Sequence, residues 1–166
     1  DWREVAGQIL ESKKRHEQLE IASRGVIGQI QEWERWGDIE PSEVQFLRER
    51  GIYVRLFLVP LKEVKNFPDG VVAKMIFATG DIAHCVAIAR RKFECPYPEI
   101  ALPKQSVSAM KRQLQEMNEG MESARKDLLS YTRYRDSLTK IRRELEKEIE
   151  LQQVLAGMGR DGSISY

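Results

Sequence analysis

Two long stripes of apolar residues constrain the fold of this chain more than any other feature. The first stripe runs from Trp2 to Gly37 in steps of three and four residues, and the second begins at Val107 and continues to about Val154, with a shift at Tyr134. This spacing places the stripe on one face of a helix and is typical of a helix that packs against another helix in a coiled coil. The sequence therefore predicts two long helices, over residues 1–37 and 104–158, with Ser106 as a candidate N-cap of the second.

The two predicted helices differ in length. The first has about 36 residues and the second about 52, or roughly 54 and 78 Å at 1.5 Å per residue. If they pair as a hairpin, the end of the second helix extends beyond the first and leaves an apolar overhang formed by Leu138, Ile141, Leu145 and Ile149. We expect this overhang to pair with chain that precedes Asp1 in a longer protein, and the chain without that partner to self-associate there or to fray.

The intervening residues 38–103 differ in composition from the two predicted helices. Their β-branched and aromatic runs, separated by glycine and proline, predict short strands and turns. Gly80-Asp81 separates two of these runs and predicts a hairpin turn. The predicted elements are a helix at 41–50, a strand at 52–60, a short helix or turn at 61–67, a hairpin at 71–79 and 83–91, and an edge strand at 99–102. The predicted fold class is α+β: a long antiparallel two-helix coiled coil with a small α/β lobe of three to four strands inserted at its tip.

Charge and cysteine content limit the classes of function. The net charge is +1, so a basic surface for nucleic acid receives no support from the total. Cys85 and Cys95 lie ten residues apart without a C-x-x-C motif, which predicts two small reduced core residues. No apolar run reaches the roughly 18 residues that a membrane-spanning helix needs.

No motif in the sequence predicts catalysis, a cofactor or a metal. The glycines of "GMGRDG", residues 157–162, have dinucleotide-binding spacing, but a long helix precedes them where a strand is required. We expect Gly157 and Gly159 to end the helix instead. His16 and His84 lack partners at metal-ligand spacing. The acidic residues lie in mixed-charge helical surfaces, without an isolated pair for acid–base chemistry.

Two alternative functions stay open at this level. The segments "YTRYR" at 131–135 and "RRKF" at 90–93 interleave bases with aromatic residues, as in a nucleic-acid-binding helical hairpin arm. Against this, six bases and seven acids give residues 1–37 a charge of −1. Residues 38–103 have nine bases and nine acids and a net charge of zero, and residues 104–158 have eleven bases and nine acids and a net charge of +2. No segment therefore carries a basic stripe. The second alternative is an enzyme with its site in the small lobe.

The order of these parts resembles the N-terminal cytoplasmic domain, in its distal part, of subunit I (subunit a) of V-type and A-type ATPases. The resemblance rests on Trp36-Gly37-Asp38 after the first helix, on the short helix that ends at Gly51, on the strand that ends at Pro60, and on the strand exit at 99–103 before the long return helix. Residues 159–166, including "DGSISY", are similar to the start of a return strand toward a missing proximal lobe. One departure is that the family's second lobe helix has no room in this chain, so the lobe is expected to be reduced.

The resemblance implies a non-catalytic stator role on the cytoplasmic face of the membrane. In the family this region anchors the peripheral stalk of the E and G subunits, and the membrane half of the subunit supports proton or sodium transport coupled to ATP. The resemblance thus implies a partner protein, and no nucleic acid, metal or cofactor. Our candidates for stalk contact are four cations of the lobe: Lys62, Lys65, Arg90 and Arg91.

Overall fold

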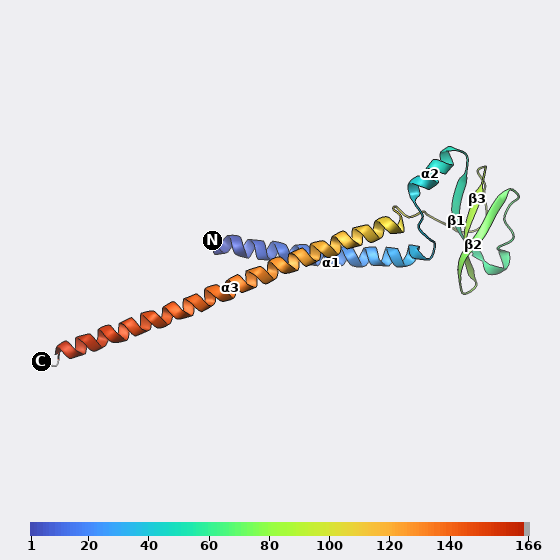
Figure 1. The fold of residues 1–166 in the computed structure, drawn as a ribbon. Helices are drawn as coiled ribbons and strands as arrows, with labels where there is room; N and C mark the ends of the chain where they lie inside the picture. The colour runs from blue at the N-terminus through green and yellow to red at the C-terminus, as the bar shows by residue number, and fades with distance from the viewer. Residues whose placement is uncertain (165–166) are drawn as a thin grey trace. The chain divides into compact units, whose positions relative to one another are not determined.

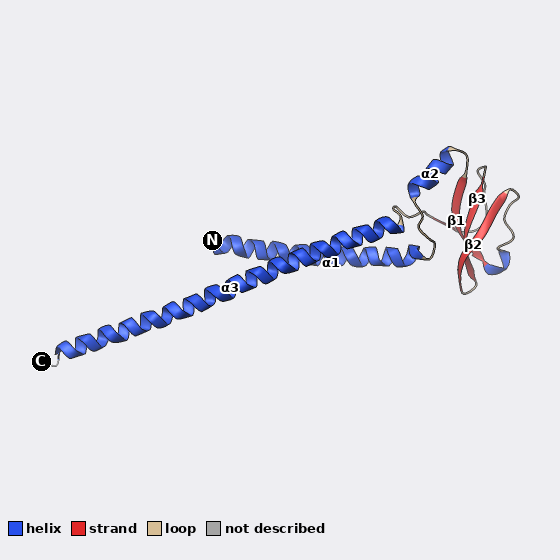
Figure 2. Cartoon of the chain, in the orientation of Figure 1, coloured by secondary structure: helices blue, strands red, loops and turns tan. Residues whose placement is uncertain are grey.

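The computed structural model describes residues 1–164, with the side chains of all of these except Trp2 and residues 159–164. Figures 1 and 2 show the order of helices and strands. The chain divides into two compact units. One unit contains Asp1–Gln18 together with the chain from Gly120 onward, and the other contains Leu19–Glu119.

Two long helices and one short helix form where the apolar stripes and the proline predict them. They are α1 (Trp2–Glu34), α2 (Pro41–Glu49) and α3 (Val107–Ile164). Pro41 occupies the first turn of α2, where its missing N–H costs nothing. The Ser106 hydroxyl accepts a hydrogen bond of 3.1 Å from the Ala109 amide, which confirms the predicted N-cap of α3.

The end of α3 differs from the prediction. We expected Gly157 and Gly159 to stop the helix and residues 159–166 to begin a return strand, but α3 continues through Ile164. Gly157 keeps a helical backbone without the positive φ that a glycine cap needs, and no proline follows it to interrupt the hydrogen-bond ladder. The expected strand is therefore wrong for residues 159–164, and residues 165–166 lie outside the described residues.

In the unit of residues 19–119, the end of α1 packs against the start of α3. Val26, Ile30 and Trp33 of the first stripe are buried in one cluster with Val107 and Met110 of the second. At the edge of this cluster, Lys111 Nζ donates a hydrogen bond of 3.0 Å to Glu34 Oε1. In the other unit, the Tyr131 hydroxyl lies 2.9 Å from Gln8 Oε1. The stripes thus identify the buried and half-buried face of α1 and that of α3 as far as Tyr131.

The four strands form one antiparallel sheet in the order β2-β3-β1-β4. Their bounds are β1 (Tyr53–Pro60), β2 (Val71–Thr79), β3 (Ile82–Ala89) and β4 (Glu99–Ile100). The β2–β3 hairpin turns at Gly80-Asp81 as predicted, and β4 is an edge strand on β1. The 3₁₀ turn η1 (Leu61–Glu63) begins the connection from β1 to β2, which passes β3 in the sheet.

The two faces of the sheet pack against different parts of the chain. On one face, Leu56 joins the cluster of Trp33 and Met110 from the helices. On the other face, Phe57 and Cys85 are fully buried beneath two connections. The covering side chains include Val64 and Phe67 from the β1–β2 connection and Phe93, Cys95 and Tyr97 from the β3–β4 connection. The lobe is therefore a sheet with helices on one face and irregular chain on the other.

An irregularity in β2 changes which face its side chains occupy. Met75 pairs with Cys85 and Phe77 pairs with His84, so Ile76 is an extra residue in the strand. Such a bulge turns the following side chain to the other face. Phe77 thereby reaches the helix-facing side of the sheet, where its ring centroid lies 5.3 Å from that of Trp36. This contact links the end of the first helix to the sheet.

Candidate docking site

The structure places the four candidate cations on different parts of the lobe. Lys62 lies in η1, which follows the end of β1 that pairs with Ile82. Arg90 and Arg91 follow the opposite end of β3, where Ala89 pairs with Tyr53 and Val71. All four side chains are exposed, including Lys65 in the β1–β2 connection. They therefore do not form one patch, because the length of β3 separates Lys62 from the two arginines.

Arg90 and Arg91 border a shallow depression of about 540 Å³. Its other lining residues are Gly70, Val72, Ile88 and Ala89. Val72 and Ile88 are direct cross-strand partners, with exposed fractions of 72% and 41%. Sequence reasoning missed these two residues because an apolar residue in a predicted strand is normally assigned to the core. The sequence does contain one indication of their exposure. Successive side chains of a strand point to opposite faces, so Val71 and Val72 cannot both lie on the same face of the sheet.

The position of Arg91 is fixed by the backbone. Its Nη2 donates a hydrogen bond of 2.7 Å to the carbonyl oxygen of Asp69, in the turn that precedes β2. Gly70 occupies this turn with a φ of 80°, which favours glycine. The turn thus holds the Arg91 guanidinium beside the depression.

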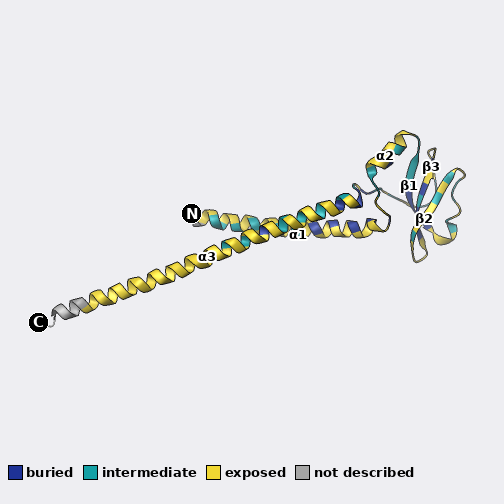
Figure 3. Cartoon of the chain, in the orientation of Figure 1, coloured by how far each residue is buried: buried dark blue, intermediate teal, exposed yellow. Residues whose placement is uncertain are grey.

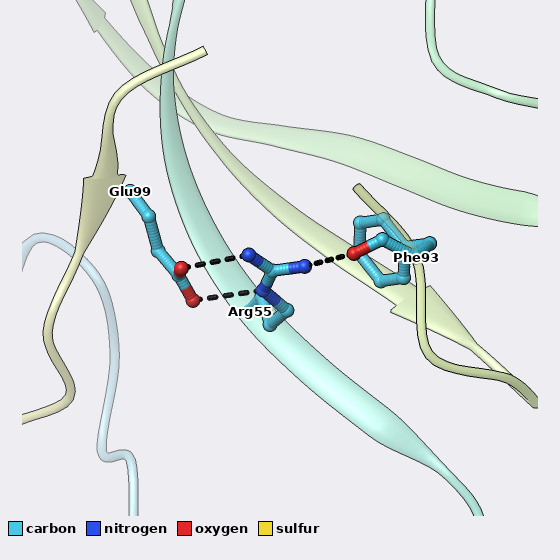
Figure 4. Close-up of polar contacts among 3 residues, drawn as sticks. All are labelled: Arg55, Phe93 and Glu99. Atoms are coloured by element: carbon cyan, nitrogen blue, oxygen red, sulfur yellow. Dashed lines mark hydrogen bonds and ion pairs between the residues drawn. The ribbon is translucent and has the colours of Figure 1, made fainter. Parts of the chain in front are cut away.

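A second polar site joins β1 to the edge strand (Figure 4). Arg55 forms two hydrogen bonds of 2.8 Å with the Glu99 carboxylate, one from Nε and one from Nη2. Its Nη1 also donates to the carbonyl oxygen of Phe93. Hydrogen bonding to Arg55 lowers the pKa of Glu99, and the same bonds raise the pKa of Arg55. Each of the three guanidinium nitrogens thus donates one hydrogen bond that holds β4 or the β3–β4 connection, which indicates a structural role for this site.

His84 lies in an aromatic cluster beside the helix ends. Its ring stacks on Phe77 with centroids 4.0 Å apart, and Trp36 contacts it edge-on at 5.4 Å. Burial is the main cause that lowers the pKa of His84, and Arg35, whose guanidinium lies 4.3 Å from the Phe77 ring centroid, adds to it. His84 Nδ1 is buried without a hydrogen-bond partner among the described residues. An uncharged imidazole suits this apolar packing.

The other residues considered for chemistry occupy ordinary positions. Both cysteines are unpaired thiols, as predicted, and burial raises the pKa of Cys85. His16 lies on the α1 stripe, and Gly157 lies within α3. Among the side chains that the structure describes, no three from histidine, cysteine or acidic residues are grouped as metal ligands. None of the helices in the described part of the chain combines the length and apolarity needed to cross a membrane.

Comparison with known proteins gives one informative match. No family model matches the chain, and no solved structure matches it. The V-type ATP synthase subunit I 1 of Treponema pallidum (strain Nichols) is 24% identical over 169 residues. The alignment covers 93% of this chain, which spans about 27% of the length of that relative. The chain is thus similar over nearly its whole length to subunit I of V-type ATP synthases, which confirms the resemblance carried by its motifs.

Proposed function

We propose that this chain is a non-catalytic stator element of a V-type or A-type ATPase, on the cytoplasmic side of the membrane. The observation that carries the proposal is the alignment with subunit I over 93% of the chain. In this role the chain anchors the E and G peripheral stalk, while other parts of the full-length subunit support proton or sodium transport coupled to ATP. Its contribution to ATP turnover is mechanical.

The packing of the helix ends onto the sheet supports a mechanical role. Trp33 in the last turn of α1 and Trp36 just after it are buried in one cluster with Leu56 of the central strand β1. Close-packed contacts of this kind transmit force because they resist compression. We propose that α1 and α3 form an antiparallel coiled coil, and that a load on the sheet passes into both helices through this cluster.

The exposed apolar residues near the end of α3 support association with a further helix. Four apolar residues of the predicted overhang are exposed along the helix (Figure 3): Leu138, Ile141, Leu145 and Ile149. An exposed apolar stripe on one helix face indicates a missing helical partner. We propose that another helix covers this stripe and extends the coiled coil.

Binding to the stalk tests the proposed role directly. The purified chain, immobilised through its C-terminus, would be incubated with a purified E–G subunit pair from the same source. We expect saturable retention of both subunits, with a matching amount of an unrelated two-helix coiled coil as the negative control. Failure to retain the pair at micromolar concentrations would contradict the anchoring role. Separate detection of E and G would show which subunit makes the contact.

A further inference from the structure

We propose that the surface formed by Val72, Ile88, Arg90 and Arg91 is the docking site for an amphipathic helix of the partner protein, with carboxylates flanking its apolar stripe. This inference rests on the proposed docking function and specifies its surface and the chemistry of its partner. We call this set of four residues the Val72–Ile88 surface.

The first argument is that part of the sheet face lacks a cover. Ile88 belongs to β3, which has a strand on both sides, yet 41% of it is exposed. The next residue on the same face, Val86, packs against the cluster of the helix ends. The helices therefore cover this face only in part, and the uncovered part presents Ile88 together with its cross-strand partner Val72. Apolar sheet faces are stable when another element packs on them.

The second argument identifies the occupant as a helix rather than an added strand. A strand added at the free edge of β2 would extend the sheet beside Val72 but would leave Ile88 of β3 uncovered. The bulge between Met75 and Phe77 also interrupts the hydrogen-bond ladder of β2, a device that protects edge strands from pairing. A helix laid across the face instead covers both apolar side chains at once.

The third argument concerns charge. Arg90 and Arg91 line the depression, and none of its lining residues is acidic. Lys74, exposed and two residues after Val72, adds a third cation on the same face of β2. The acidic residue of the neighbouring turn, Asp69, meets Arg91 through its backbone carbonyl. A partner helix with Asp or Glu beside its apolar stripe complements this surface, and a basic helix is repelled by it.

The chain offers a matched control for a charge-reversal test. The double variant Arg90→Glu/Arg91→Glu changes the net charge by the same amount as Lys62→Glu/Lys65→Glu, and all four residues are exposed. Neither Lys62 nor Lys65 lines the depression. The single variant Val72→Asp tests the apolar contact at an exposed position. Circular dichroism and thermal unfolding of each variant verify that the fold is retained.

The experiment measures the affinity of each variant for the purified E–G pair. We expect Val72→Asp and Arg90→Glu/Arg91→Glu each to weaken binding by at least about tenfold, the loss typical of a central interface contact. Lys62→Glu/Lys65→Glu should change the affinity by less than about threefold.

Equal binding by all variants would overturn the Val72–Ile88 surface and leave the anchoring role standing. A wild-type chain that does not bind the pair overturns both. If only the β2 amides that point away from β3 gain protection from hydrogen exchange on binding, a strand has been added at the edge of β2, which contradicts the helix.

Discussion

Arg55 on β1 and Glu99 on β4 are joined by two parallel hydrogen bonds of 2.8 Å, although 44 residues separate them in the chain. Bidentate pairing of this kind combines charge with a fixed geometry. The edge strand β4 has only two residues and pairs with β1 at Leu56 and Phe57. The side-chain pair therefore supplies much of what holds this short strand against the sheet.

Glu99→Gln should lower the free energy of unfolding by about 1 kcal/mol at neutral pH, a value limited because the pair is partly exposed to solvent. The ion pair lowers the pKa of Glu99 below its ordinary 4.5, so its stabilisation is complete above that pH and is lost as the pH falls through the folded-state pKa. Urea unfolding of both proteins at pH 7 and at successively lower pH checks this. A difference that stays constant into strong acid would contradict the assignment.

Trp36→Ala should be strongly destabilising, by about 3 kcal/mol. Trp36 is buried, and it contacts Phe77 and His84 edge-on at the point where the helices meet the sheet. Removal of the indole leaves a cavity between these elements. Chemical denaturation followed by circular dichroism gives the change, and Phe46→Ala, an exposed aromatic on α2, is the control with an expected effect of about 0.5 kcal/mol or less. Similar effects of the two substitutions would show that Trp36 does not join helices and sheet.

His84 should make the stability of the lobe depend on pH. Its folded-state pKa is lowered below the ordinary 6.5, chiefly by burial, so the unfolded chain binds the proton more readily. Stability is therefore complete above about pH 6.5 and decreases as the pH falls below it, until the folded imidazole is protonated as well. His84→Phe, which keeps an aromatic ring against Phe77, should flatten this part of the profile. Unfolding free energies of both proteins between pH 7.5 and 5 provide the test.

The apolar stripe of α3 should drive association of the chain when no other helix covers it. We expect the double variant Ile141→Glu/Leu145→Glu to shift the sedimentation equilibrium toward monomer, because it places charge in the middle of the stripe. Thr139→Glu/Gln153→Glu adds the same charge to exposed positions off the stripe and should leave association unchanged. A wild-type monomer whose Ile141 and Leu145 amides resist hydrogen exchange would contradict this expectation.

The chain should not be retained on RNA. The net charge of its three sequence segments stays between −1 and +2, and the bases of "YTRYR" at 131–135 lie on an exposed helix that also carries acids. A nucleic-acid-binding arm would release counterions on binding and show a steep dependence on salt. Filter binding with a structured RNA at low salt measures this. Tight binding that weakens steeply as salt is added would favour the helical-arm function over the stator.

The residues of the candidate docking site show where sequence reasoning reached its limit. Arg90 and Arg91 could be selected because a cation after an apolar strand is expected at the surface. Lys62 was selected for the same reason, and only strand pairing shows that it lies at the opposite end of β3. Val72 and Ile88 looked like core residues, and their exposure depends on how far the helices extend over the sheet.

The sequence by itself determined the local elements, because helix and strand periodicity, glycine and proline turns and the Ser106 cap act within a few residues of one another. Tertiary structure decided the strand order, in which the connection from β1 to β2 passes β3. It also decided the bulge that turns Phe77 toward Trp36 and the pairing of Arg55 with Glu99. The physical reason is that these contacts join residues far apart in the chain. Their free energy comes from shared burial and hydrogen bonding, which no local pattern contains.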